Sequence, residues 1–92
     1  MEMYAKFIQV IPTVEGEKDG KSWKRGGFVV RTMEDIERSI AFDVIKEEII
    51  NALPNIPIGS TVRINFSIES REFGLRWYTS ARCYFLDVVP SR

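Results

Sequence analysis

Two groups of residues in this sequence combine cationic side chains with aromatic rings at short spacing. The first group lies between residues 18 and 25 and consists of Lys18, Lys21, Trp23, Lys24 and Arg25. The second group lies between residues 71 and 84 and consists of Arg71, Arg76, Tyr78, Arg82 and Tyr84. Cations neutralise phosphates, and aromatic rings accept stacked bases at about 1–3 kcal/mol for each base. This combination predicts binding of a single-stranded nucleic acid.

Both groups also fit roles that need no nucleic acid. Trp23 would cover one end of the folded domain while the neighbouring lysines keep a loop soluble. In the second group, the arginines would pair across strands with Glu69 or Glu72. The tyrosines would instead pack across a sheet face or between subunits. The sequence leaves these alternatives open.

The overall composition excludes several kinds of chemistry. The chain of 92 residues has no histidine and one cysteine, so it holds no catalytic triad, Cys-His dyad or usual zinc ligand set. Cys83 has no partner for an internal disulfide, which fits a reducing compartment. No glycine-rich phosphate-binding loop occurs. We therefore expect a protein that is not an enzyme and that binds no metal or cofactor.

The charges balance overall but are unevenly distributed. Thirteen basic residues face thirteen acidic ones, yet residues 18–31 sum to +4 and residues 32–59 sum to −4. Local charge decides where a polyanion binds, so one basic face is compatible with a neutral chain. No signal peptide and no apolar run of membrane-spanning length is present, and we expect a cytoplasmic protein without membrane contact.

Five segments have the composition or the alternation of β-strands. We expect these strands at residues 4–11, 23–32, 38–44, 60–71 and 76–88. The polar stretch 13–22 contains two glycines and predicts a long exposed hairpin loop. The pair Gly26-Gly27 predicts a bulge or bend in the second strand. Phe73-Gly74 predicts a tight turn between the last two strands.

One segment changes from a strand period to a helix period. Apolar residues at i, i+4, i+5 and i+8 predict a short amphipathic helix over residues 45–53. Asp43 is placed to cap its N-terminus, and Pro54 ends it. Three strands, one helix and two strands give the chain order of an all-β, five-stranded Greek-key OB-fold barrel. We expect residues 1–92 to form one such domain.

The alternation also assigns the two faces of the predicted strands. We expect four aromatic residues in the core, namely Phe7, Phe28, Phe42 and Phe66. In the last strand, the residues expected to point inward are Trp77, Thr79, Ala81, Cys83 and Phe85. The residues expected to share the outer face are then Arg76, Tyr78, Ser80, Arg82 and Tyr84. That outer face would alternate between cations and aromatic rings.

Several short patterns along the chain resemble a known family. They are Ala5-Lys-Phe-Ile-x-Val-Ile-Pro12, Gly20-x-x-Trp23-Lys24, Val30-x-Thr32, Phe42-Asp-Val, Gly59-x-x-Val62 and Ser70-Arg-Glu-Phe-Gly-x-Arg-Trp-Tyr-Thr-Ser-x-Arg82. Together they resemble a small bacterial family of unknown function whose members are described as OB-fold proteins similar to single-stranded-DNA-binding proteins. The resemblance covers nearly the whole chain, and its most specific part is the hairpin around Arg71.

The resemblance implies an OB fold, binding of single-stranded DNA in replication, recombination or repair, and self-association as a dimer or tetramer. Two features depart from the pattern. Tyr84 stands where a tryptophan would follow Arg82, and the chain ends Val89-Pro-Ser-Arg92 without an acidic tail. Partner recruitment through such a tail is therefore not expected.

The leading hypothesis is non-catalytic, largely sequence-independent binding of single-stranded DNA. Trp23, Tyr78 and Tyr84 would stack on bases. The phosphates would be neutralised by Lys21, Lys24, Arg25, Arg71, Arg76 and Arg82. The alternative is a protein-interaction or assembly module that buries the same Tyr/Arg face against another subunit. RNA is a further ligand to test, because OB grooves also accept it.

Overall fold

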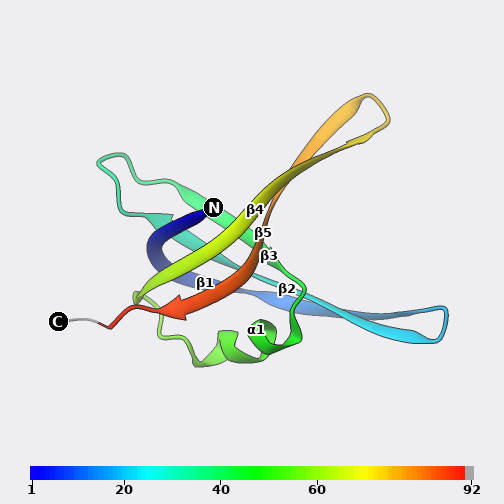
Figure 1. The fold of residues 1–92 in the computed structure, drawn as a ribbon, viewed down its shortest axis with the longest axis horizontal. Helices are drawn as coiled ribbons and strands as arrows, with labels where there is room; N and C mark the ends of the chain where they lie inside the picture. The colour runs from blue at the N-terminus through cyan, green and yellow to red at the C-terminus, as the bar shows by residue number, and fades with distance from the viewer. Residues whose placement is uncertain (91–92) are drawn as a thin grey trace.

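The computed structural model describes residues 1–90, which form a closed five-stranded barrel (Figure 1). The elements in chain order are β1 (Glu2–Lys18), β2 (Lys21–Thr32), β3 (Ser39–Val44), α1 (Glu47–Ala52), a 3-10 turn (Leu53–Asn55), β4 (Thr61–Phe73) and β5 (Arg76–Val88). The strands close in the order β1-β2-β3-β5-β4. All neighbours pair antiparallel except β3 and β5, which are parallel. The predicted all-β OB-type barrel, with one short helix between β3 and β4, is confirmed.

The barrel core is built around aromatic rings from four strands. The ring of Phe28 lies between those of Phe7, at a centroid distance of 5.6 Å, and Phe42, at 5.3 Å. Phe66 packs edge-on against Phe42 at 5.1 Å. Phe7, Phe28 and Phe42 are fully buried, and Phe66 packs against the buried cluster, as the alternation predicted.

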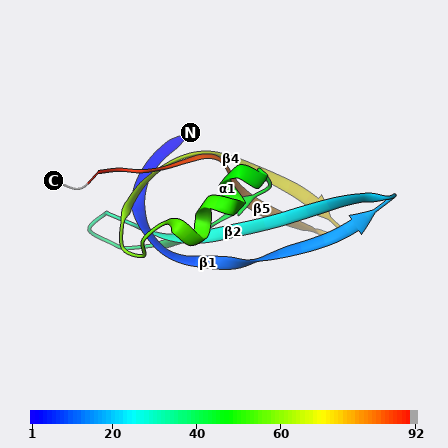
Figure 2. The same cartoon turned by 90° about the horizontal axis from the view of Figure 1, so that it is seen from below.

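The helix is shorter than predicted and is not capped by Asp43. Figure 2 shows α1 in front of the barrel strands when the molecule is seen from below. Ile50 and Leu53 are buried in the core. The residue before α1 is Lys46, and it forms no side-chain cap. Asp43 lies within β3, because the pairing of β3 with β5 extends through Val44. Among residues 1–90, no helix is long and apolar enough to span a membrane.

The hairpin predicted at residues 13–22 is correct, but the long loop predicted for it is wrong. There β1 and β2 continue as a paired hairpin, and the connection is the two-residue turn Asp19-Gly20. Both turn residues have positive φ, at 53° and 76°, as the common two-residue hairpin turn requires. The segment is polar because both faces of this hairpin are exposed, so it shows no alternation between apolar and polar residues.

The irregularity predicted at Gly26-Gly27 lies mainly in the facing strand. The register of β1 shifts between Ile11 and Val14, opposite Gly26. Both glycines are buried, and a Cβ atom at Gly27 would lie 2.6 Å from the carbonyl oxygen of Phe42. Because that contact is with backbone, only glycine lets β2 approach β3 this closely.

The inward face predicted for β5 is correct only in the middle of the strand. Cys83 is buried, and Ala81 packs against the core. Trp77 is 67% exposed, because this end of β5 extends beyond the barrel. The register shifts opposite Asn65 and Phe66, so β5 carries an extra residue and the alternation reverses: Leu86 packs against the core and Phe85 is exposed.

The buried thiol gives the barrel a measurable dependence on alkaline pH. Loss of hydration on burial raises the pKa of the Cys83 thiol from its ordinary 9.0 to about 11. The unfolded chain therefore loses this proton at a lower pH than the folded chain does. The resulting stabilisation is complete below pH 9 and is lost as the pH rises through about 11, which lowers the free energy of unfolding by about 2–3 kcal/mol.

Urea unfolding followed at pH 8 and at pH 11 measures this loss. Cys83→Ala is the matched control, because it removes the thiol and leaves every other ionisable side chain unchanged. We expect the free energy of unfolding to fall less between pH 8 and pH 11 in the variant than in the wild-type protein, and the difference is the contribution of the thiol. Equal declines in the two proteins would contradict the prediction.

Candidate functional site

Two hairpins extend beyond the closed barrel and diverge from each other (Figure 1). We call residues 14–25 of β1 and β2 the first arm, and residues 67–82 of β4 and β5 the second arm. β2 pairs with β3 only from Gly26 onwards, and β1 pairs with β4 only as far as Lys6, so the first arm has no neighbouring strand. The arms leave the same side of the barrel (Figure 1), and apart from Ala81 and Arg82, which pair with β3, their edges are unpaired.

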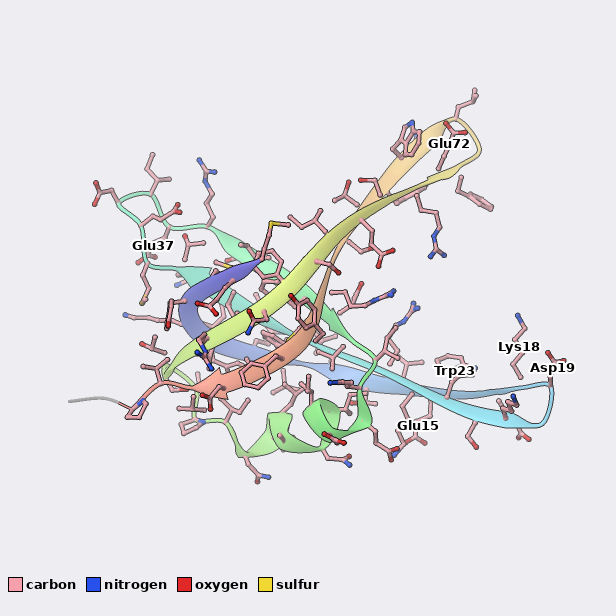
Figure 3. All side chains as sticks on the ribbon, in the orientation of Figure 1. Glu15, Lys18, Asp19, Trp23, Glu37 and Glu72 are labelled. Atoms are coloured by element: carbon pink, nitrogen blue, oxygen red, sulfur yellow. The ribbon has the colours of Figure 1, made fainter. Side chains whose placement is uncertain are left out.

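The first arm has one basic face and one ion-paired face. Residues opposite each other in an antiparallel pair point to the same side, and successive residues alternate. One face therefore carries the cross-strand pairs Val14–Arg25, Gly16–Trp23 and Lys18–Lys21. The other face carries Glu15 and Lys24. Figure 3 shows Trp23 and Lys18 on the side of the arm toward the second arm, and Glu15 on the opposite side.

Trp23 lies flat on the first arm. A Cβ atom at Gly16 would lie 2.3 Å from the Trp23 ring, so the indole occupies the space above this glycine. The Trp23 residue is 44% exposed. One ring face therefore covers the hairpin backbone, and the indole still presents surface to solvent, as a stacking platform requires.

Lys24 is separated from the other cations of its group. Its Nζ atom lies 3.6 Å from a carboxylate oxygen of Glu15 and 3.6 Å from one of Glu47. Its charge is thus largely balanced on the helix side of the first arm. The sequence pattern placed Lys24 and Arg25 together, but neighbouring residues of a strand point to opposite faces.

The second arm also concentrates its cations on one face. The pairs Arg71–Tyr78 and Phe73–Arg76 share that face with Glu69, Ser80 and Arg82. Trp77 lies opposite Glu72 on the other face, where Ser70 and Thr79 form a hydroxyl–hydroxyl hydrogen bond of 2.9 Å. The aromatic ring closest in sequence to Arg76 therefore points away from it.

The two arms meet at a pocket beside the barrel wall, which we call the arginine pocket. Its lining residues are Arg25, Asp43, Glu69, Ser70, Arg71, Tyr78, Ser80 and Arg82. Arg25 comes from the first arm, Asp43 from β3 and the rest from the second arm. Asp43 pairs with Gly27 on one side and with Arg82 on the other, so the β2-β3-β5 pairing brings Arg25 and Arg82 together.

The electrostatics of the pocket favour an anion. Three guanidinium groups face two carboxylates, and Nη1 of Arg82 lies 3.1 Å from Oε1 of Glu69. Within residues 1–90, Arg25 and Arg71 form no ion pair. Guanidinium groups bind phosphate and carboxylate in the same bidentate geometry. In this part of the chain, no cluster of three or more carboxylate or thiol side chains is arranged to hold a metal ion.

The sequence of this chain matches a known domain family. A family model described as a domain of unknown function, DUF3127, matches residues 2–87. The chain belongs to this family. No curated protein matches its sequence significantly.

The fold of this DUF3127 domain is also found in a solved structure. The crystal structure of a small single-stranded DNA-binding protein from Streptomyces coelicolor is similar to it, with a TM-score of 0.51. The similarity covers 97% of this chain and 94% of that chain, at 11% sequence identity. At that identity the comparison establishes the shared fold.

Tyr84 lies apart from the other predicted site residues of the DUF3127 domain. It is the extra residue of β5 at the register shift, and it lines a separate, more apolar pocket beside α1 with Lys46 and Ile49. The expectation that it shares a face with Arg82 is wrong, because the bulge interrupts the alternation between them. A bulge leaves no reliable mark in the sequence.

The remaining predicted residues fall into two sets. Four of them meet in the arginine pocket: Arg25, Arg71, Tyr78 and Arg82. Lys21, Trp23 and Arg76 lie further out on the arm faces that contain the pocket residues. Glu69 and Asp43 also line the pocket, although their place there was not predicted from the sequence. The two-residue spacing from Glu69 to Arg71 would have placed Glu69 on the same face, whereas Asp43 depends on the closure of the barrel.

Proposed function

We propose that this DUF3127 domain binds single-stranded DNA, without catalysis and largely independently of sequence, in the space between its two arms, which we call the groove. The observation that carries the proposal is the arginine pocket, where cations from both arms meet at the base of the groove. A strand lying there contacts Arg25 on one side and Arg71 on the other. The fold shared with a single-stranded DNA-binding protein supports the same proposal.

We call the arm faces that carry the pocket residues the inner faces and the opposite arm faces the outer faces. The inner faces supply the two kinds of contact that a single strand needs. Lys21 and Arg76 extend the positive charge outward from the pocket, and Lys18 lies directly opposite Lys21. Trp23, at 44% exposure, and Tyr78, at 54%, offer rings for stacking on bases. Phosphate contacts carry no sequence information, and every base has a ring face, so the predicted binding is tolerant of sequence.

Tryptophan fluorescence tests the proposal directly. We expect oligo-dT to quench the emission, with an affinity that falls steeply as the salt concentration rises. The chain has two tryptophans, and only Trp23 lies on an inner face of the groove. Trp77→Phe should therefore retain the quenching and Trp23→Phe should abolish it. Trp23→Ala should weaken binding by about 1–3 kcal/mol.

Trp77→Phe is the matched control, since it makes the same replacement on the outer face of the second arm. If Trp77→Phe abolishes the quenching and Trp23→Phe retains it, the DNA binds outside the groove. If no binding of oligo-dT is seen at low salt, the proposed function is wrong. Competition between oligo-dT and oligo-rU of equal length determines whether RNA is also a ligand.

A second candidate function is self-assembly through the second arm. Three apolar side chains near its tip are strongly exposed: Phe73 at 79%, Leu75 at 101% and Trp77 at 67%. Phe73 and Trp77 lie on opposite faces of the arm and Leu75 lies in the turn between its strands, so the apolar surface surrounds the tip. Exposed apolar surface is typical of protein interfaces. A dimer or tetramer formed here would dissociate on Leu75→Asp with Trp77→Asp, measured by sedimentation velocity. If the wild-type protein sediments as a monomer, this candidate is excluded.

A further inference from the structure

Glu69 lies among the cations of the arginine pocket, where an acidic residue opposes the binding of a polyanion. Its carboxylate is 3.1 Å from Nη1 of Arg82, the shortest ion-pair distance among the described residues. Glu69 lies opposite Ser80, so it projects from the same face as Arg71 and Tyr78. The side chains of Arg82 and Glu69 are 34% and 46% exposed. A pair this open adds little to folding stability.

The guanidinium groups of the pocket have unused donors. Nε of Arg82 is buried and has no hydrogen-bond partner among residues 1–90. Arg25 and Arg71 form no ion pair in the same part of the chain. Each guanidinium carries five N–H donors, and the hydroxyl groups of Tyr78 and Ser80 line the same pocket. A carboxylate on one terminal nitrogen therefore leaves most of the donors free.

We propose that the arginine pocket is a subsite for one phosphate of the bound strand, and that Glu69 occupies it in the free protein as an internal competitor. This inference rests on the proposed function. A phosphate offers Arg82 the same kind of charged oxygens as Glu69, and it also reaches the donors that Glu69 leaves free. On binding, the phosphate replaces the carboxylate on Arg82, and Glu69 turns toward solvent, to which it is already half open.

Asp43 does not share this role. It lines the pocket from β3, but within residues 1–90 it forms no ion pair with Arg25 or Arg82. Asp43 makes the electrostatic potential of the pocket less positive, but it does not form an ion pair with a guanidinium group there. Glu69 is therefore the residue that sets how readily the pocket accepts a phosphate.

The test is Glu69→Gln, with oligo-dT affinity measured over a series of salt concentrations. We expect binding to tighten about three- to tenfold at low salt, because Arg82 is released without loss of side-chain volume. The slope of log affinity against log salt should stay close to that of the wild-type protein, because the bound strand makes the same phosphate contact with Arg82 in both proteins. Glu72→Gln is the matched control. It removes the same charge from the same strand, but Glu72 lies on the outer face opposite Trp77.

A double-mutant cycle separates the local pair from the general field. In an Arg82→Gln background, Glu69→Gln should no longer tighten binding, because no guanidinium remains to be released. If Glu69→Gln tightens binding no more than Glu72→Gln, or if its gain persists without Arg82, the inference is overturned while the proposed function stands. If the wild-type protein does not bind oligo-dT at low salt, both are overturned.

Discussion

Replacing the two unpaired arginines of the pocket by glutamate, as Arg25→Glu with Arg71→Glu, should weaken oligo-dT binding by about a hundredfold, at about 1.4 kcal/mol for each arginine. One arginine comes from each arm, so the change affects both sides of the groove. Neither has a carboxylate partner among the described residues, and the reversal leaves no buried charge behind. The salt dependence of the remaining binding should become shallower by about 0.7 for each lost phosphate contact.

The matched control for this double reversal is Lys6→Glu with Arg38→Glu. Both residues are exposed, lie outside the two arms and form no ion pair within residues 1–90, and the change in net charge is the same. We expect its effect on affinity to be small by comparison. An equal loss in the control would show that binding follows net charge rather than the arginine pocket. A change in sedimentation caused only by the pocket variant would favour an assembly module that buries the Tyr/Arg face against another subunit.

The barrel was predictable because burial imposes a period on its strands. Val62 and Ile64 are buried and Phe66 packs against the core, and they alternate with polar residues along β4. The same rule fails where a strand leaves the barrel. Residues 13–18 have no buried face, so their sequence resembles that of a loop. Trp77 continues the apolar alternation of β5, but it lies beyond the end of the barrel and is exposed. In this segment, the Asp19-Gly20 pair is the local pattern that indicates a hairpin, because Asp-Gly is typical of a two-residue hairpin turn.

The candidate site was predictable in residue type but not in arrangement. Cations and rings at residues 21–25 and 71–82 were recognisable from their spacing alone. Their meeting depends on the parallel pairing of β3 with β5, which places Asp43 beside Arg82 and brings the first arm to the second. Such a pairing joins residues far apart in the chain and leaves no local pattern. The displacement of Tyr84 and the ion pairing of Lys24 likewise depend on a bulge and on a helix packed nearby.

Phe28→Ala should be the most destabilising single substitution that the described core offers, with a loss of about 3–5 kcal/mol in the free energy of unfolding. Phe28 is fully buried, and its ring stacks between those of Phe7 and Phe42. Truncation removes contacts with two neighbouring strands at once and leaves a cavity in a small core. Urea denaturation measures the loss, which is a large part of the roughly 5–15 kcal/mol available to a domain.

Phe73→Ala is the matched control for this truncation, because it deletes the same ring where it is 79% exposed on the second arm. We expect its unfolding midpoint to stay close to that of the wild-type protein. Phe28 also lies three residues from Arg25 on β2, and it pairs directly with Phe42, next to Asp43. The packing that stabilises the barrel therefore also fixes the pocket, and partial unfolding of Phe28→Ala by urea should abolish oligo-dT binding over the same concentration range. Binding that persists after the barrel has unfolded would show that the arms act without the scaffold that aligns them.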